Sequence, residues 1–177
     1  EMARAAEALR VGDPLDLQSQ AGAVNNAAQL NANLGFVAKA EAEGAEIVTG
    51  GARILEETGG LYMAPTIATG VKPQDTLFQQ EVFGPVLAVT AFDREEEAVA
   101  LANGTAFGLA GGLWTRDLSR AHRMIAALKT GVVHVNTYGG PDVTVPLGGV
   151  KQSGNGHDKS LHAFDKYIDL KTAWIKL

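Results

Sequence analysis

Hydrophobic and polar positions follow two different periods along this chain, and its middle switches between them. Apolar residues at the helical period indicate amphipathic helices, and short apolar or alternating runs bounded by Gly and Pro indicate strands. The expected helices are Glu1–Arg10, Asn25–Glu43, Glu95–Asn103, Leu118–Lys129 and Ser160–Lys166. The expected strands are Glu46–Thr49, Leu61–Ala68, Phe83–Phe92, Leu109–Thr115, Val132–Asn136 and Tyr167–Leu177. The repeated strand–helix–strand order predicts an α/β fold with a mostly parallel sheet flanked by helices.

Several shorter signals refine this pattern. Asp93 stands where the helix Glu95–Asn103 needs an N-cap. A loop rich in Gly and Pro runs from Thr137 to Gly156. Glu1–Leu9 reads as the end of a helix that begins upstream, so we expect the chain to be a fragment.

The last predicted strand, Tyr167–Leu177, carries polar residues on alternate positions and follows a long loop. An unpaired strand edge is normally blunted or paired. The pattern leaves two partners open, another strand of the same chain or the same strand of a second copy.

Composition narrows the class of protein. The net charge is -5 and the basic residues are scattered, whereas phosphate binding needs clustered Lys and Arg, so we expect no nucleic-acid partner. The arginines Arg116, Arg120 and Arg123 occur at helical spacing and indicate a solvated helix face. No charge-free apolar run is long enough to cross a bilayer, so no membrane partner and a cytoplasmic location are expected.

The residues that could carry chemistry are few. The chain has no Cys, which excludes a thiol nucleophile, disulfides and Cys-based metal sites. Its four histidines show no metal-binding spacing, so no metal site is expected. Ser153, His157 and Asp158 are close in sequence, but they lack a G-x-S-x-G elbow and are interpreted as a polar turn.

Two further features stay open on physical grounds. The Gly-rich loop Leu147–Gly156 is not a dinucleotide-binding fingerprint, and its Lys151 could meet an anion or lie at the surface. Glu81 directly precedes the long apolar run and could accept hydrogen bonds from ligand hydroxyls. A solvated carboxylate in a turn explains Glu81 equally simply.

Five segments, in order, resemble motifs of the aldehyde dehydrogenase superfamily. The V-G-D-P turn is Val11–Pro14, and Glu81–Val86 resembles E-[IV]-F-G-P-V. Ala102–Ala110 resembles A-N-x-x-x-[YF]-G-L-A, and Gly131–Asn136 resembles G-x-x-x-[VI]-N. Pro146–Gly156 resembles P-F-G-G-x-K-x-S-G-x-G. Together they extend the resemblance over essentially the whole chain, to the C-terminal portion of that family.

Within the superfamily, three stretches look most like the gamma-glutamyl-gamma-aminobutyraldehyde dehydrogenase branch. They are Thr115–Met124, Lys151–Ala163 and Leu170–Leu177. Departures from the family pattern put the substrate pocket and the loop anchoring in doubt. Leu147 replaces a Phe, Val150 replaces an aromatic residue, and His157-Asp158 replaces an Arg-Glu pair, which removes a bidentate donor.

The resemblance implies a covalent mechanism. A Cys thiolate attacks the aldehyde, the thiohemiacetal passes hydride to NAD or NADP, and water activated by a Glu releases the carboxylic acid. Carried onto this sequence, Glu81 would bind the nicotinamide ribose hydroxyls and Phe83 would pack near the nicotinamide.

Other roles carried over concern the substrate and the subunits. The residues that would line the substrate mouth are Tyr138, Asp142, Val143 and Leu147. Tyr167–Leu177 would be the strand that joins subunits into a homo-oligomer, which favours the intermolecular partner. The implied division is 1–136 as a partial catalytic α/β domain, 137–166 as mouth loop and short helix, and 167–177 as oligomerisation strand.

The family's catalytic Cys, general-base Glu and dinucleotide-binding domain precede the matched region. We therefore expect a C-terminal fragment of an NAD(P)-dependent aldehyde dehydrogenase, inactive by itself and without tight NAD or NADP binding. Two alternatives are a stand-alone, non-catalytic self-association module and one half of a split enzyme. The sequence leaves the aldehyde, the choice of cofactor and the oligomer size open.

Overall fold

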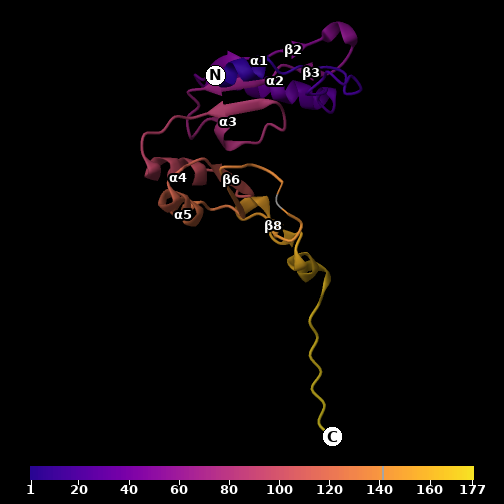
Figure 1. The fold of residues 1–177 in the computed structure, drawn as a ribbon. Coiled ribbons are helices and arrows are strands. Elements are labelled where there is room, and N and C mark those ends of the chain that lie inside the picture. Colours follow the sequence, from indigo (N-terminus) through magenta and orange to yellow (C-terminus); the bar gives the residue numbers. More distant parts are fainter. Residues whose placement is uncertain (141) are drawn as a thin grey trace. The chain divides into compact units, whose positions relative to one another are not determined.

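The structure is a computed structural model that describes residues 1–140 and 142–177. The chain divides into two compact units, Glu1–Phe92 and Asp93–Leu177. The boundary between the two units lies inside residues 1–136, the range that the resemblance implies to be a partial catalytic α/β domain. Figure 1 labels the elements of both units along the coloured ribbon.

The first unit is a small mixed sheet covered by a long helix. Its helices are α1 (Met2–Glu7), α2 (Ala27–Ala42) and α3 (Thr76–Gln79), with a 3-10 turn η1 (Glu56–Thr58). Its strands are β1 (Glu46–Thr49), β2 (Arg53–Ile54), β3 (Tyr62–Met63), β4 (Thr66–Thr69) and β5 (Val86–Val89). The three-stranded sheet has the order β1-β4-β5. Strand β1 is antiparallel to β4, whereas β4 and β5 are parallel.

Helix α2 begins where the sequence provides a cap, because the Asn26 side chain accepts a hydrogen bond from the backbone N–H of Gln29 at 2.8 Å. Its buried face packs over the sheet and α3. The residues of this core are Leu30, Val37, Ala40, Met63, Ala68, Val71 and Leu77. Burial of these side chains is the main force that holds the unit together.

Two predicted strands of this unit are shorter than expected. The run Leu61–Ala68 forms two strands, because Pro65 between them has no N–H to give to a ladder. The run Phe83–Phe92 pairs only over β5, because Phe83 has a left-handed φ of 53° and Pro85 follows it. The segment that precedes β5 is therefore a turn and not part of the sheet.

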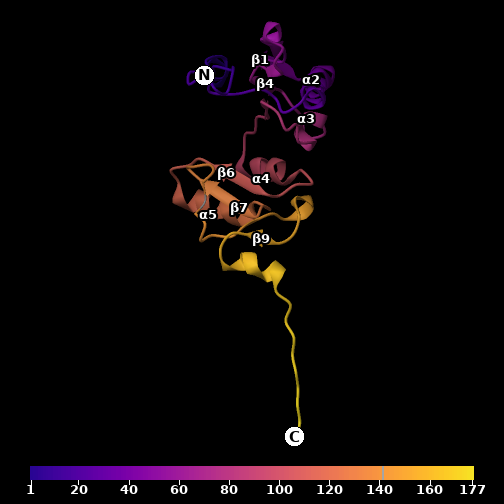
Figure 2. The ribbon, with the colours of Figure 1, turned by 90° about the vertical axis from the view of Figure 1, so that its right-hand side faces the viewer.

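The second unit contains a parallel strand pair with its crossover helix. Its helices are α4 (Glu95–Asn103) and α5 (Leu118–Ala127), with 3-10 segments η2 (Lys151–Ser153) and η3 (Leu161–Tyr167). Its strands are β6 (Ala110–Leu113), β7 (Val132–Val135), β8 (Leu147–Gly148) and β9 (His157–Asp158). Strands β6 and β7 are parallel and joined by α5, whereas β8 and β9 are antiparallel (Figure 2). The expected α/β fold is confirmed.

The predicted bounds of α4 are those of the structure, but its predicted cap is wrong. Helix α4 has Arg94 as its N-cap residue, so Asp93 lies one position too early. The backbone N–H of Asp93 instead donates to the Glu97 carboxylate at 3.1 Å. The cap of α5 is of the ordinary kind, because Asp117 accepts from the backbone N–H of Arg120 at 3.0 Å.

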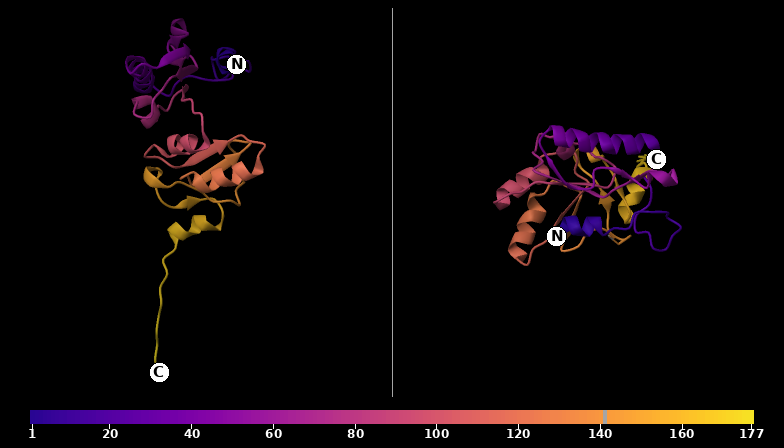
Figure 3. Two further views of the ribbon diagram at one scale, coloured as in Figure 1. Left: turned by 90° about the vertical axis from the view of Figure 1, so that its left-hand side faces the viewer. Right: turned by 90° about the horizontal axis from the view of Figure 1, so that it is seen from above.

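The C-terminal segment forms no strand within the chain. Residues 168–177 carry no secondary structure, and their apolar side chains are exposed; Trp174 is 93% exposed. Figure 3 shows them as an extended trace that leaves η3. Pairing of this segment within the same chain is therefore wrong for the described residues.

Candidate functional site

Glu81 and Phe83 lie in the turn between α3 and β5 of the first unit. Glu81 is exposed, and no other described residue binds its carboxylate. Phe83 is 77% exposed although it is a large aromatic residue, and its φ of 53° is uncommon for a residue with a Cβ. The turn thus presents a free carboxylate and a bare ring two residues apart.

The backbone of this turn is held from two sides. The carbonyl oxygen of Pro85 accepts from the Thr66 N–H of β4 at 2.8 Å. The carbonyl oxygen of Val82 lies 2.9 Å from the side-chain amides of both Gln29 and Asn33, on α2. Gln29 and Asn33 were not among the residues that the sequence predicts for the site. Their polar type on the buried face of a helix is the only signal that could have indicated them.

A hollow of about 260 Å³ lies beside the turn. Its lining comes from the loop before α2, from α2 and β3, and from the turn itself. Among the lining residues are Val24, Gln29, Met63, Phe83, Gly84 and Pro85. Small-molecule pockets are usually about 300–1,000 Å³, so this hollow is too small for a dinucleotide. A free carboxylate and an exposed ring fit the hydroxyls and the flat face of one end of such a cofactor.

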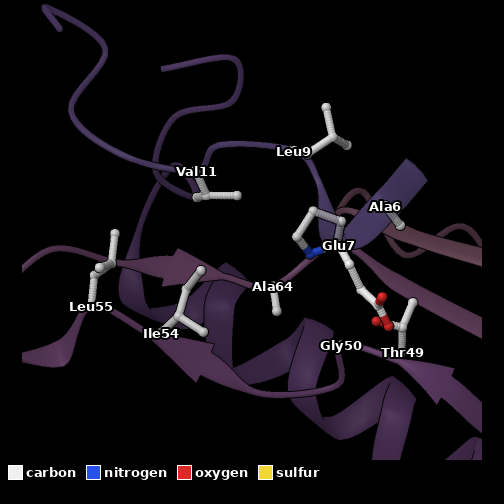
Figure 4. A pocket seen from close by; sticks show the side chains of 10 residues that line it. Ala6, Glu7, Leu9, Val11, Thr49, Gly50, Ile54, Leu55 and Ala64 are labelled. Carbon is white, nitrogen blue, oxygen red and sulfur yellow. The ribbon is translucent and has the colours of Figure 1, made fainter. Parts of the chain in front are cut away.

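A second hollow of the first unit, about 320 Å³, is lined by residues of α1, β1 and β2 and by the loops beside them (Figure 4). Its lining is mostly apolar, with residues such as Leu9, Val11, Ile54 and Leu55. Glu7 is the charged residue of this lining. The site residues that the sequence predicts lie elsewhere.

Tyr138, Asp142 and Val143 lie in the segment between β7 and β8 of the second unit, and Leu147 is the first residue of β8. Tyr138 is exposed, and its ring centroid lies 5.0 Å from that of His134 in β7. His134 is half-buried in its strand. The start of the segment is fixed by Asn136, whose side chain forms two 2.8 Å hydrogen bonds with the backbone of Thr115.

Local hydrogen bonds hold the other residues that are predicted to line the substrate mouth. The Asp142 carboxylate accepts from the Thr144 N–H at 2.8 Å, and this bond lowers the pKa of Asp142. Val143 is exposed, and its carbonyl accepts from the Ser160 N–H at 2.8 Å. Leu147 is half-buried in β8 and pairs with Asp158. The structure thus brings these residues into one loop region.

The Gly-rich loop Leu147–Gly156 is hydrogen-bonded to the chain between α4 and β6. Lys151 donates from Nζ to the carbonyl oxygens of Asn103 and Thr105, both at 3.0 Å. The Ser153 hydroxyl accepts from the Gly108 N–H at 3.0 Å, and the Val150 N–H donates to Gly108 O at 3.0 Å. Asp158 pairs with Lys166. These bonds explain the polar residues of the loop without an anion or a catalytic triad.

Charge on the two helices of the second unit is locally compensated. Arg120 and Arg123 of α5 bind the Glu95 carboxylate of α4 at 3.0 and 2.9 Å. The hydrogen bond from Arg123 is the largest cause that lowers the pKa of Glu95, to about 2. Arg120 and Arg123 of the predicted solvated face are thus about half exposed and share one carboxylate, whereas Arg116 precedes α5. Among residues 1–140 and 142–177, no group of His, Asp and Glu side chains could hold a metal ion, and no helix is long and apolar enough to cross a membrane.

Comparison with known proteins decides the family. The profile of the aldehyde dehydrogenase family matches residues 1–173. The chain belongs to the aldehyde dehydrogenase family. The members of this family are oxidoreductases that act on aldehydes.

Among the relatives of this aldehyde dehydrogenase segment is the NADP/NAD-dependent aldehyde dehydrogenase PuuC of Escherichia coli K12. It is 47% identical over 94% of this chain and 33% of its own length. A betaine aldehyde dehydrogenase of Cereibacter sphaeroides is 44% identical over 98% of this chain and 36% of its own length. The chain therefore spans about a third of the length of the curated relatives it matches.

Solved structures of aldehyde dehydrogenases also match nearly all of this chain and about a third of their own length. The AldA indole-3-acetaldehyde dehydrogenase of P. syringae, as a mutant in complex with NAD+ and IAA, superposes with a TM-score of 0.95 at 50% identity. The aldehyde dehydrogenase KauB of Pseudomonas aeruginosa gives 0.93 at 49% identity. Each match covers 99% of this chain and 35% of the other.

Proposed function

We propose that this chain supplies the C-terminal third of an NAD(P)-dependent aldehyde dehydrogenase. The nucleophilic Cys and the dinucleotide-binding domain would then come from polypeptide outside these 177 residues. The observation that carries this proposal is the match to residues 1–173 over only a third of the relatives' length, in a chain without Cys. The chain by itself is expected to be inactive.

The role of the turn before β5 is to hold one end of the cofactor. Glu81 accepts hydrogen bonds from the nicotinamide ribose hydroxyls, because its carboxylate is exposed and unengaged by other described residues. Phe83 offers an exposed ring on which the nicotinamide packs. The cofactor, when bound, accepts a hydride from the substrate. The residues of this chain orient it and cover one face of it.

The role of the segment between β7 and β8 is to shape the substrate mouth. Tyr138 and Val143 present exposed apolar surface, Leu147 is half-buried in β8, and the carboxylate of Asp142 stays ionised above its lowered pKa. The motifs favour the gamma-glutamyl-gamma-aminobutyraldehyde branch. The identities of 47% to PuuC and 44% to betaine aldehyde dehydrogenase are close, so they support an aldehyde dehydrogenase and leave the aldehyde open.

The role of residues Tyr167–Leu177 is to join copies of the enzyme. The backbone of residues 168–177 is unpaired within the chain and extended, and Leu170 and Trp174 are almost fully exposed. An extended segment with apolar side chains gains most by adding to a sheet edge. We place that edge on a second copy, which makes the protein a homo-oligomer. The cytoplasmic location and the lack of a nucleic-acid or membrane partner stay predictions.

The test replaces Glu81 in the longer enzyme that contains this segment. Glu81→Gln should raise the KM for NAD or NADP about tenfold or more, because a hydrogen bond to a charged group contributes roughly 1.5–3 kcal/mol. Glu57→Gln, an exposed carboxylate of the same unit, is the matched control and should leave the KM unchanged.

The 177-residue chain titrated with either cofactor should show no measurable binding. Micromolar binding, aldehyde turnover by this chain, or an unchanged KM in the Glu81 variant would contradict the proposal.

A further inference from the structure

The side chain of Asn33 is completely buried, yet it is polar. It belongs to the core face of α2, between the apolar residues Leu30 and Val37. A buried amide is costly unless its hydrogen bonds are satisfied. An apolar residue at this position would extend the core without that cost. Packing of the helix therefore does not explain why a polar side chain occupies this position.

The contacts of Asn33 lead to the candidate site. With its amide nitrogen facing the turn, Asn33 donates to the carbonyl oxygen of Val82 at 2.9 Å and to the backbone oxygen of Gln29 at 3.1 Å. The side-chain amide of Gln29 donates to the same Val82 carbonyl at 2.9 Å. Val82 stands between Glu81 and Phe83 in the sequence. The carbonyl that the helix binds is thus the one between the two predicted cofactor contacts.

Gly84 completes the arrangement. A Cβ built on Gly84 would lie only 2.2 Å from the end of the Asn33 side-chain amide, so a side chain at 84 cannot coexist with Asn33 in this position. The φ of Gly84 is not in the left-handed region, which means that lack of space and not conformation demands the glycine. Asn33 and Gly84 form a close contact that fixes how the turn lies on α2.

This contact bears directly on Phe83. The residue keeps a left-handed φ of 53°, which costs energy and persists only where neighbouring contacts enforce it. The bond to the Val82 carbonyl acts on the N-terminal side of Phe83. The Asn33–Gly84 contact and the bond from Thr66 to Pro85 act on its C-terminal side. The exposed ring is therefore held in place by its backbone, since solvent surrounds most of its own surface.

We propose that Asn33 is a positioning residue that presets the Glu81–Phe83 turn for the cofactor. This inference rests on the proposed function, because it assumes that Glu81 and Phe83 contact the cofactor. It adds that their geometry is prepared by an amide on α2 before the cofactor arrives. Such preparation lowers the ordering cost of binding and leaves the chemistry untouched.

The first experiment uses the 177-residue chain. Asn33→Leu keeps the branched shape of the side chain but removes its hydrogen bonds to the carbonyl oxygens of Val82 and Gln29. Asn33→Ala is a second variant, whose smaller side chain cannot crowd the core around α2. The NMR coupling between the amide and Hα protons of Phe83 reports its φ and should move from the left-handed value toward the extended one. Asn31→Leu and Asn31→Ala, on the exposed face of the same helix, are the matched controls and should leave the coupling unchanged.

The second experiment uses the longer enzyme. The Asn33 variants should raise the cofactor KM at least fivefold while kcat stays within twofold, and the Asn31 variants should change neither. An unchanged Phe83 coupling or an unchanged KM in a folded Asn33 variant overturns the inference. So does failure of both Asn33 variants to fold, because the amide would then serve the unit as a whole.

Glu81→Gln separates the two claims. If it leaves the cofactor KM unchanged, the proposed function fails, whatever the Phe83 coupling shows. If it raises the KM and the Asn33 variants do not, the proposed function stands and the positioning role is lost.

Discussion

At the scale of single residues, the most strongly shifted side chain is Glu95, which joins α4 to α5 through Arg120 and Arg123. Its pKa is lowered from 4.5 to about 2, chiefly by the hydrogen bond from Arg123. A carboxyl whose folded pKa lies below its unfolded value contributes stability above the unfolded value. That contribution is lost as the pH falls toward the folded pKa.

Replacement of Glu95 should therefore have a pH-dependent effect. Near neutral pH, Glu95→Gln is expected to melt a few degrees below the parent chain, since the two arginines lose their partner. The gap should close between about pH 4.5 and about pH 2 as the parent carboxyl is protonated. Thermal melts followed by circular dichroism check this. A gap that is constant over this pH range, or one equally large for the α4 control Glu96→Gln, would contradict it.

At the scale of elements, two glycines differ in the space that their surroundings leave for a side chain. Gly35 lies within α2, and a Cβ there would meet nothing within 4 Å. Gly131 precedes β7, and a Cβ there would lie 1.8 Å from the backbone oxygen of Gly148 in β8. Neither has a left-handed φ. The same substitution should thus have opposite signs at the two sites.

Gly35→Ala is expected to raise stability by about 0.5–1 kcal/mol, because alanine restricts the unfolded chain and suits a helix. Gly131→Ala is expected to lower it by about 1–3 kcal/mol or more, because the loop that carries β8 must move away from β7. Chemical denaturation of the two variants and the parent measures both values. Equal effects of the two substitutions would show that the space around Gly131 is not as close as described.

The elements show how far the sequence alone could lead. The helix Glu95–Asn103 was predicted with its bounds, because its periodicity and its acidic first turn are local signals. The split at Pro65 and the early end of the strand Phe83–Phe92 were missed, because apolar runs look alike in strands and in core-facing turns. Glu81 and Phe83 are predicted through a resemblance and stay predictions. The contact of Asn33 with the Val82 carbonyl could not be predicted, because a burial pattern cannot show a bond to a carbonyl 49 positions away.

At the scale of the whole molecule, the family is secure and the assembly remains a prediction. We expect the chain to associate through residues Tyr167–Leu177, whose apolar side chains are exposed in the single copy. A chain that ends at Lys166 should sediment as a smaller species than the parent at the same concentration. Sedimentation velocity measures this difference. Identical sedimentation of the two chains would rule out the segment as the joining strand.

Two matched substitutions test whether association depends on the C-terminal segment itself or on any exposed apolar side chain. Leu170 is 99% exposed and Leu17, in the first unit, is 97% exposed. Leu170→Asp should therefore reduce association, and Leu17→Asp, an equally exposed control, should not. Equal effects of both would indicate non-specific aggregation through apolar surface.

The exposed Trp174 gives the C-terminal segment an optical property of its own. The chain holds two Trp residues, and the other, Trp114, lies directly after β6 in a folded unit. When a neighbouring copy covers Trp174, the indole leaves water and its emission shifts to shorter wavelength. The chain therefore carries a built-in fluorescent sensor at its C-terminal end, and with Trp114 replaced by Phe that sensor can report assembly in dilute solution without any added label.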